Sequence, residues 1–231
     1  MRNHIHPTLI LPLMILFCGM AAELKAGLSP CDPDTTTIIE WELQRILQSP
    51  PEGWSILGEP KIIDSPFGKA VLFDGQRDAL VFDANPLVRL RRFTIEVVMR
   101  PDTNGLPEQR FLHFGEVRGE RVMVETRLTK DSLWFLDTYM KSGQTGQTLA
   151  DSTIVHRLNL WYHIAFVADD GKFETYVNGK KELEGQISFS PFSMGQTSIG
   201  ARLNRVNWYK GSMVKIRITP AAVGPREFMK Y

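Results

Sequence analysis

Residues 161–179, with the sequence WYHIAFVADDGKFETYVNG, decide how the fold is interpreted. Two runs typical of β-strands, 161–168 and 172–177, flank the turn sequence DDGK at 169–172. The pair Asn178-Gly179 follows the second run directly. Aspartate-glycine and asparagine-glycine pairs accept the positive φ angles that tight hairpin turns require. The stretch therefore predicts two consecutive antiparallel hairpins.

Working outward from these hairpins, short runs with period-two alternation of apolar and polar residues follow one another from residue 69 to residue 219. Turn residues separate the runs, and no alternation of strands with helices indicates a parallel sheet. Ten strands at this spacing predict an all-β, two-sheet antiparallel sandwich. The predicted strands are 69–74, 79–82, 93–100, 110–115, 121–128, 133–139, 161–168, 172–177, 197–201 and 212–219.

The first 22 residues have the pattern of a signal peptide, with a weakly basic start and an apolar run over 8–22. The run has 15 residues and contains Pro12, whereas a membrane-spanning helix needs about 20. We therefore expect export to the periplasm, the cell surface or the medium, without a membrane span in the mature protein. Lipid attachment at Cys18 is an alternative that the bulky Phe17 before it disfavours.

The remaining composition is that of one globular domain. Hydrophobic residues make up 43% of the chain, and 27 basic residues stand against 26 acidic ones. A balanced charge gives no field that would attract nucleic acid. Removal of the signal peptide would leave Cys31 as the single cysteine, so no internal disulfide is expected. These features predict a monomeric domain that depends on its apolar core for stability.

The segment 23–60 contains several prolines and is predicted to be irregular. Within it, the run 38–47 (IIEWELQRIL) fits either a short amphipathic helix or a strand. From residue 61 to residue 231 the alternating pattern dominates. We therefore assign 1–22 to the signal peptide, 23–60 to an irregular segment and 61–231 to the sandwich domain.

Four segments in this order resemble a laminin G-like domain of the concanavalin A-like lectin and glucanase superfamily. They are the opening pair AVLFDG at 70–75 and DALV at 78–81, the central FTIEV at 93–97, WYHIAFV at 161–167 with YVNG at 176–179, and the closing SIG at 198–200, YKG at 209–211 and VKIRI at 214–218. The resemblance covers about residues 66–228. It implies a jelly-roll sandwich in which Trp161 and Tyr176 pack between the sheets.

The resemblance also implies a candidate calcium ion, because many related lectin folds carry one. Asp74 and Asp78 lie four residues apart across a glycine-containing turn, near Asp83 and Asn85. Calcium takes six to eight oxygen ligands, and carboxylates are among its preferred donors. An aspartate-glycine pair is equally an ordinary turn former, so the metal and the plain turn both remain open.

Alternation along the strands predicts a polar face that would suit a sugar ligand. It places Glu96 on one outward face, Glu125 and Arg127 on another, and Asp137 and Tyr139 on a third. If these strands are neighbours, their side chains form a charged floor with an aromatic edge. The alternative is a solvated face with cross-strand ion pairs.

The loop 201–209 has a composition suited to recognition, with Arg202, Arg205 and Trp208 beside two asparagines. Loops carry binding residues more often than their share of the chain. An ordinary turn whose tryptophan covers the core would give the same composition.

Catalysis is the competing class of function. Retaining glycosidases need two carboxylates about 5 Å apart, and neither 115–120 nor 124–127 has the acid-x-acid-x-x-acid pattern of such enzymes on this fold. A jelly-roll hydrolase or lyase using Glu96, Glu125 and Tyr139 stays open. The sequence favours a secreted, non-catalytic module that binds a polysaccharide or a glycoprotein glycan, with a structural or adhesion module as the nearest rival.

Overall fold

Both predicted hairpins are present in the computed structural model, which describes Met1 and residues 37–231. They join three strands, β12 (Tyr162–Asp169), β13 (Lys172–Val177) and β14 (Lys180–Gln186). The turn residues Asp170 and Gly171 have φ angles of 50° and 97°, and Asn178 and Gly179 have φ angles of 50° and 75°. Positive φ at both central residues matches the right-handed twist of the flanking strands, so both hairpins close with two-residue turns.

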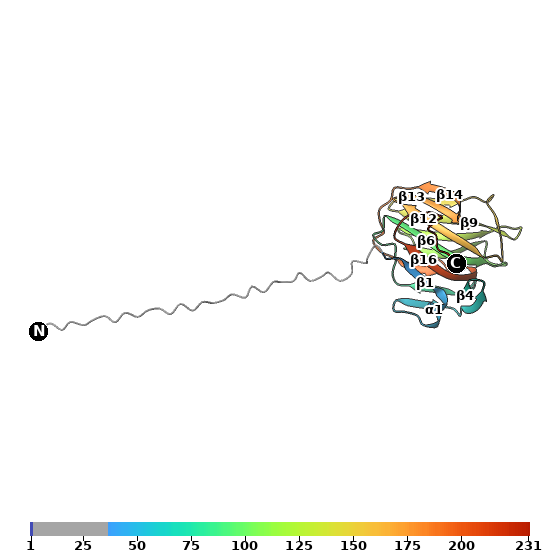
Figure 1. Cartoon of the computed structure of the whole chain (residues 1–231), viewed down its shortest axis with the longest axis horizontal. Helices are drawn as coiled ribbons and strands as arrows, with labels where there is room; N and C mark the ends of the chain where they lie inside the picture. The colour runs from blue at the N-terminus through green and yellow to red at the C-terminus, as the bar shows by residue number, and fades with distance from the viewer. Residues whose placement is uncertain (2–36) are drawn as a thin grey trace. The chain divides into compact units, whose positions relative to one another are not determined.

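These strands form one side of sheet A, in which β6 and β16 are central and all pairs are antiparallel (Figure 1). The strand order is β14-β13-β12-β6-β16-β4-β3, and β1 pairs with the second half of β16. The remaining strands of sheet A are β1 (Ile39–Glu42), β3 (Lys61–Ser65), β4 (Gly68–Asp74), β6 (Arg92–Pro101) and β16 (Lys210–Thr219).

Sheet B packs against sheet A and has the order β10-β9-β8-β7-β15-β5-β2, with β11 paired to β9. Its strands are also antiparallel. They are β2 (Trp54–Leu57), β5 (Ala79–Phe82), β7 (Glu108–Gly115), β8 (Arg121–Leu128), β9 (Leu133–Ser142), β10 (Thr145–Ala150), β11 (His156–Arg157) and β15 (Gln196–Ile199). The two-sheet jelly-roll prediction is confirmed, and each of the ten predicted strands has a counterpart.

The segment predicted to be irregular contributes to both sheets. The run 38–47 forms strand β1 and then the one short helix of the described residues, α1 (Leu43–Gln48). Strand β1 extends sheet A and β2 extends sheet B. Trp41 and Trp54 meet edge to face, with ring centroids 5.0 Å apart, and pack against the core. The domain therefore begins before residue 61, and Pro50, Pro51 and Pro60 lie between its elements.

The core fills the space between the sheets. Along β6 the side chains of Phe93, Ile95, Val97 and Met99 point inward and are buried, as the period of two requires. The largest fully buried side chain is Trp134 of β9. Burial of aromatic and branched side chains from facing sheets is the main source of stability in such a sandwich.

The prediction that Trp161 and Tyr176 lie between the sheets is wrong. Both pack on the outer face of sheet A, Trp161 half-buried against Phe67 and Tyr176 against Phe228. Alternation distinguishes the two faces of a strand but does not say which face meets the other sheet. An aromatic side chain on the outer face is here covered by the chain itself.

The C-terminal segment provides that cover. Residues 221–231 run across the outer face of sheet A, and the C-terminus lies over β6 and β16 in Figure 1. Phe228 and Met229 are buried there. The Thr94 side chain donates to the Ala221 carbonyl at 2.8 Å and accepts from the Val223 N–H at 3.1 Å. Sheet A is thus covered on both faces over its central strands.

The predicted signal peptide beyond Met1, together with Cys18 and Cys31, lies outside the described residues. Within the part of the chain that the structure describes, no helix is both long enough and apolar enough to cross a membrane.

Candidate functional site

The outer face of sheet B gathers a group of charged side chains from β7, β8 and β9. Val122 and Val124 of β8 point into the core, so the residues that alternate with them point outward. Glu125 lies opposite Asp137 of β9 on one side and opposite Arg110 of β7 on the other. The register of three neighbouring strands therefore creates a row of acidic and basic groups.

Ion pairs tie this row together. The Arg127 guanidinium lies 2.6 Å from Asp137 Oδ2, 2.5 Å from Glu108 Oε1 and 3.7 Å from Glu125 Oε2. Arg110 Nε lies 2.9 Å from Glu125 Oε1. Because Glu125 and Asp137 are almost completely buried, these pairs are shielded from solvent and restrict the side chains to one arrangement.

Burial dominates the protonation of Glu125. Removal of solvent raises the pKa of its carboxyl to about 7, and neighbouring Asp137 adds to the rise. Arg110 and Arg127 act in the opposite direction and only partly offset burial. Glu125 therefore changes charge near neutral pH, at the floor of this face.

Tyr139 supplies the aromatic surface of the face. The Arg121 guanidinium carbon lies 4.8 Å from the centre of the Tyr139 ring, a cation-π distance. A side chain at Gly146 on β10 would meet the Tyr139 hydroxyl at 2.5 Å, so glycine makes room for the ring. Both neighbours hold the ring in one position while part of it stays exposed.

The loop after β15 brings a further arginine to the same place. The Arg202 N–H donates to the Val206 carbonyl at 3.1 Å, and the Arg205 N–H donates to the Arg202 carbonyl at 2.8 Å. The guanidinium of Arg202 donates to the Val117 carbonyl at 2.9 Å. A pocket of about 310 Å³ results, and its charged lining consists of Arg110, Arg121, Arg127, Arg202, Glu125 and Asp137.

His113 lies beneath this pocket and is fully buried. Burial lowers its pKa to about 4, and the nearby Arg202, Arg121 and Arg110 lower it further, against the raising effect of the Glu116 carbonyl. Nε2 lies 3.1 Å from that carbonyl. The imidazole is therefore neutral at pH 7, with Nε2 as its hydrogen-bond donor.

The structure brings five of the predicted binding residues together. Glu125, Arg127, Asp137, Tyr139 and Arg202 all line the pocket. The loop residues Arg205 and Trp208 do not line it. Arg205 is exposed on the turn and Trp208 is half-buried.

Sequence reasoning missed four residues of the pocket lining, of which two are charged, Arg110 and Arg121. Arg121 shares the odd-numbered alternation of Glu125 and Arg127, so the pattern of its own strand could have found it. Arg110 precedes a β-bulge, where the register shifts between Arg110 and Leu112. A bulge changes the facing of the residues that follow it, which hides Arg110 from simple alternation.

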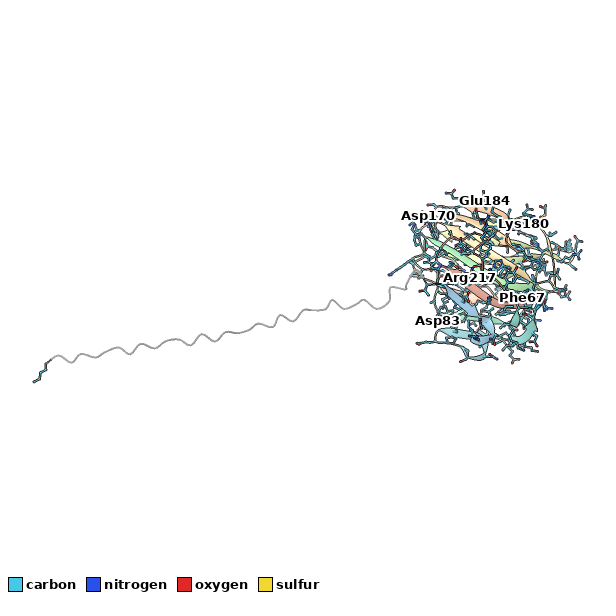
Figure 2. All side chains as sticks on the ribbon, in the orientation of Figure 1. Phe67, Asp83, Asp170, Lys180, Glu184 and Arg217 are labelled. Carbon is cyan, nitrogen blue, oxygen red and sulfur yellow. The ribbon has the colours of Figure 1, made fainter. Side chains whose placement is uncertain are left out.

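Glu96 is not part of this face, because β6 belongs to sheet A. Its side chain points away from the core, as predicted, but the C-terminal segment covers it completely. The Glu96 carboxylate accepts from Met229 N–H at 2.6 Å and from Arg217 Nε at 2.8 Å, and lies 3.0 Å from His163 Nε2. Arg217 is labelled on this side of the molecule in Figure 2. Glu96 is therefore a structural ion-pair residue beneath the segment.

The position of Glu96 in the other sheet also decides whether Glu96, Glu125 and Tyr139 could form the active site of a lyase or hydrolase. Glu96 lies in sheet A, whereas Glu125 and Tyr139 lie on the outer face of sheet B. The core of the sandwich stands between these two positions. The three side chains cannot act on one substrate molecule.

Asp74 and Asp78 are already satisfied by protein donors. Asp74 Oδ1 accepts from the backbone N–H groups of residues 76, 77 and 78 at 2.8–3.1 Å. Asp78 accepts from the N–H groups of Glu59 and Asp74 at 2.8 and 3.1 Å. Arg77 lies 3.5 Å from Asp74 Oδ2.

Such an arrangement is that of a turn stabilised by its aspartates, and N–H donors aimed at both carboxylates do not fit a calcium ion. Among the described residues, no three histidine, cysteine, aspartate or glutamate side chains come close enough together to hold a metal. The geometry therefore favours the plain turn over the calcium site, and a calcium titration of the protein decides between the two.

Comparisons with solved structures agree with the fold. A heptameric SAP-like pentraxin from Limulus polyphemus aligns with a TM-score of 0.56 and 16% identity, over 68% of this chain and 78% of that one. Domain 4 of AbnA, a GH43 extracellular arabinanase from Geobacillus stearothermophilus, was solved with arabinotriose. It aligns with a TM-score of 0.52 and 16% identity, over 78% of this chain and 88% of that one.

A third similar structure is the binding domain of Botulinum Neurotoxin DC in complex with SialylT. It has a TM-score of 0.56 and 13% identity, over 75% of this chain and 44% of that one. At these identities the likeness shows the fold alone.

No curated protein matches the sequence. A laminin G-type family model, described as the concanavalin A-like lectin/glucanases superfamily, matches residues 74–227. Since this match spans more than half of the chain, the protein belongs to the concanavalin A-like lectin/glucanase superfamily.

Proposed function

We propose that this protein is an exported, non-catalytic domain that binds carbohydrate through the outer face of sheet B. The main support is a single observation. Glu125, Arg127, Asp137, Tyr139 and Arg202 converge on one pocket of about 310 Å³. Charged groups that are fixed by each other and aimed at one place present hydrogen-bond donors and acceptors without needing to reorganise.

The chemistry of the pocket suits a sugar. Arginine presents a planar fork of donors that can engage two neighbouring oxygens. The exposed part of the Tyr139 ring offers an apolar surface for the C–H groups of a sugar ring. Among the similar folds described above, the arabinanase domain was solved with arabinotriose and the neurotoxin domain with SialylT. These cases support carbohydrate as the ligand class for the present domain.

Hydrolysis is the second candidate, because Glu125 and Asp137 lie opposite each other and Glu125 has a pKa raised to about 7. A glycosidase uses two facing carboxyl groups, one of which keeps its proton near neutral pH. Here both carboxylates are almost fully buried and are held by Arg110 and Arg127. A glycosidic oxygen cannot reach them without displacing an arginine, so binding fits the geometry better.

A glycan array probed with the mature domain tests the proposal, followed by affinity measurements on the best ligand. We expect Tyr139→Ala to weaken binding by roughly 1–3 kcal/mol, by analogy with aromatic stacking on nucleic-acid bases. Trp208→Ala is the matched comparison, because this residue is also aromatic and partly exposed but does not line the pocket. Equal losses in both variants, or no ligand on a broad array, would contradict the proposed surface.

A further inference from the structure

The four arginines of the pocket differ in their partners. Arg110 and Arg127 form ion pairs with Glu108, Glu125 and Asp137. Arg121 and Arg202 have no carboxylate within ion-pair distance among the described residues. Each donates one hydrogen bond to a backbone carbonyl, Arg121 to Gly119 at 2.7 Å and Arg202 to Val117 at 2.9 Å. Two guanidinium groups in one pocket therefore lack a counter-charge.

The nearest acidic residues of the 116–120 loop are engaged elsewhere. Glu116 accepts from the Glu120 N–H at 3.3 Å, and Glu120 accepts from the Gly143 N–H at 3.0 Å. The Nε atoms of Arg121 and Arg202 are buried and have no hydrogen-bond partner. A buried donor without a partner is costly. Because these Nε atoms are closed to solvent, a ligand would meet the two guanidinium groups through their terminal N–H donors.

The guanidinium groups of Arg121 and Arg202, which lack ion-pair partners, are also held in place before any ligand binds. Arg121 is held between its bond to Gly119 and the Tyr139 ring. Arg202 is fixed by its bond to Val117 and by the tight turn at Arg205, whose φ is 60°. Fixed positive groups of this kind select a ligand by charge and shape together.

From these two fixed arginines without carboxylate partners, we infer that the ligand is an acidic saccharide. Its carboxylate or sulfate group binds Arg121 and Arg202, and its sugar ring lies against Tyr139. The inference rests on the proposed carbohydrate-binding function and narrows it to one ligand class. Arginine binds both anions through parallel N–H donors, so the shared chemistry is a planar or tetrahedral oxyanion.

The electrostatics of the pocket support an anion. Burial lowers the pKa of Arg202, and the positive charges of Arg110 and Arg121 lower it further. Arg202 stays protonated at pH 7, but its environment holds more positive charge than the local carboxylates neutralise. A bound carboxylate or sulfate would relieve this repulsion, whereas a neutral sugar would leave it in place.

Calorimetric titration with matched ligands tests the inference. Oligogalacturonate and its fully methyl-esterified form share one backbone and differ in the free carboxylate, and a sulfated oligosaccharide provides the second anion. We expect the free acid or the sulfated ligand to bind at least about tenfold more tightly than the ester. Affinity for the charged ligand should fall as salt concentration rises.

Arg121→Gln and Arg202→Gln should each weaken binding of the charged ligand by about ten- to a hundredfold and change binding of the ester little. Arg92→Gln is the matched control, since Arg92 is an exposed arginine paired with Asp169 on sheet A. Thermal melts check that each variant folds. If a glutamine variant unfolds, Arg121→Lys keeps the charge and loses the planar fork, and it should still bind several-fold more weakly.

The outcomes distinguish failure of the acidic-saccharide inference from failure of the proposed carbohydrate-binding function. Equal binding of acid, sulfated ligand and ester would overturn the acidic-saccharide inference and leave the carbohydrate-binding proposal standing. Binding of none of these, together with an empty glycan array, would overturn the proposed function itself. Charge-selective binding that survives both arginine substitutions would place the anion elsewhere and refute the assigned residues.

Discussion

Glu125 and His113 make opposite contributions to stability over the same pH range. The Glu125 pKa rises from 4.5 to about 7 on folding, chiefly through burial. The His113 pKa falls from 6.5 to about 4, also chiefly through burial. Between pH 4.5 and pH 6.5 the folded protein holds a proton on Glu125 that the unfolded chain has lost. Over the same range the folded protein lacks a proton on His113 that the unfolded chain still binds.

The signs follow from proton linkage. Glu125 stabilises the fold fully at pH values below 4.5, and this contribution is lost as pH rises toward about 7. His113 stabilises the fold fully above pH 6.5, and this contribution is lost as pH falls toward about 4. Each effect has a slope of about 1.4 kcal/mol per pH unit, with opposite sign. In the wild-type protein the two slopes nearly cancel.

Glu125→Gln removes one of the two slopes. Between pH 4.5 and pH 6.5, the free energy of unfolding of this variant should rise by about 3 kcal/mol relative to that of the wild type. His113→Gln should show the reverse, a relative fall of similar size. Glutamine is close to both side chains in size and can hydrogen-bond to Arg110 or to the Glu116 carbonyl.

The measurement is urea unfolding followed by tryptophan fluorescence at pH 4.5, 5.5 and 6.5, for the wild type and both variants. All other titrating groups are common to the three proteins, so differences between the curves isolate Glu125 and His113. Parallel pH profiles for the wild type and Glu125→Gln would refute the claim that burial holds the Glu125 proton. A Glu125→Gln variant whose free energy of unfolding fell with pH relative to that of the wild type would show that the predicted sign is wrong.

Three further predictions concern stability. Trp134→Ala should cost ~3–5 kcal/mol because its side chain is fully buried between the sheets. Half-buried Trp161→Ala should cost about 1–2 kcal/mol, and thermal melts that rank the two the other way would contradict the packing. Millimolar calcium should leave the melting temperature unchanged; a calcium-dependent rise that Asp74→Ala abolishes would establish the metal site. Deleting residues 228–231 should cost about 3–5 kcal/mol because Glu96 loses a buried N–H donor and its cover, and urea unfolding with an unchanged midpoint would exclude this role.

The strands that pack against the core could be predicted from sequence, whereas several edge elements could not. Strand β14, KKELEGQ, has no apolar alternation because it lies at the edge of sheet A, with Lys180 and Glu184 exposed (Figure 2). Charged residues at a sheet edge oppose pairing with other chains, and they also remove the pattern that identifies a strand. The Asn178-Gly179 turn was the remaining sign that a partner strand follows.

In the candidate site, too, the facing of side chains along one strand could be predicted, whereas contacts between residues far apart in sequence could not. Alternation along β8 and β9 correctly placed Glu125, Arg127, Asp137 and Tyr139 on one outward face, because facing is a local property of a strand. The position of Glu96 depended on which sheet β6 joins and on what covers that sheet. Both are set by contacts between residues far apart in sequence, such as the bond from Met229 to Glu96, which no single strand pattern encodes.

The C-terminal segment over sheet A also limits the valency of the domain. With the central strands of sheet A covered by residues 221–231, the carbohydrate site that we propose on sheet B would give the described domain one attachment point. A single shallow pocket on one molecule releases a repetitive polymer whenever that one contact opens. Several copies displayed together raise the effective concentration of free pockets along the same polymer, and joint binding can exceed the single affinity by about 10²–10⁴. Under the proposed function, lasting attachment of this domain to a repetitive glycan would therefore depend on how many copies are displayed side by side.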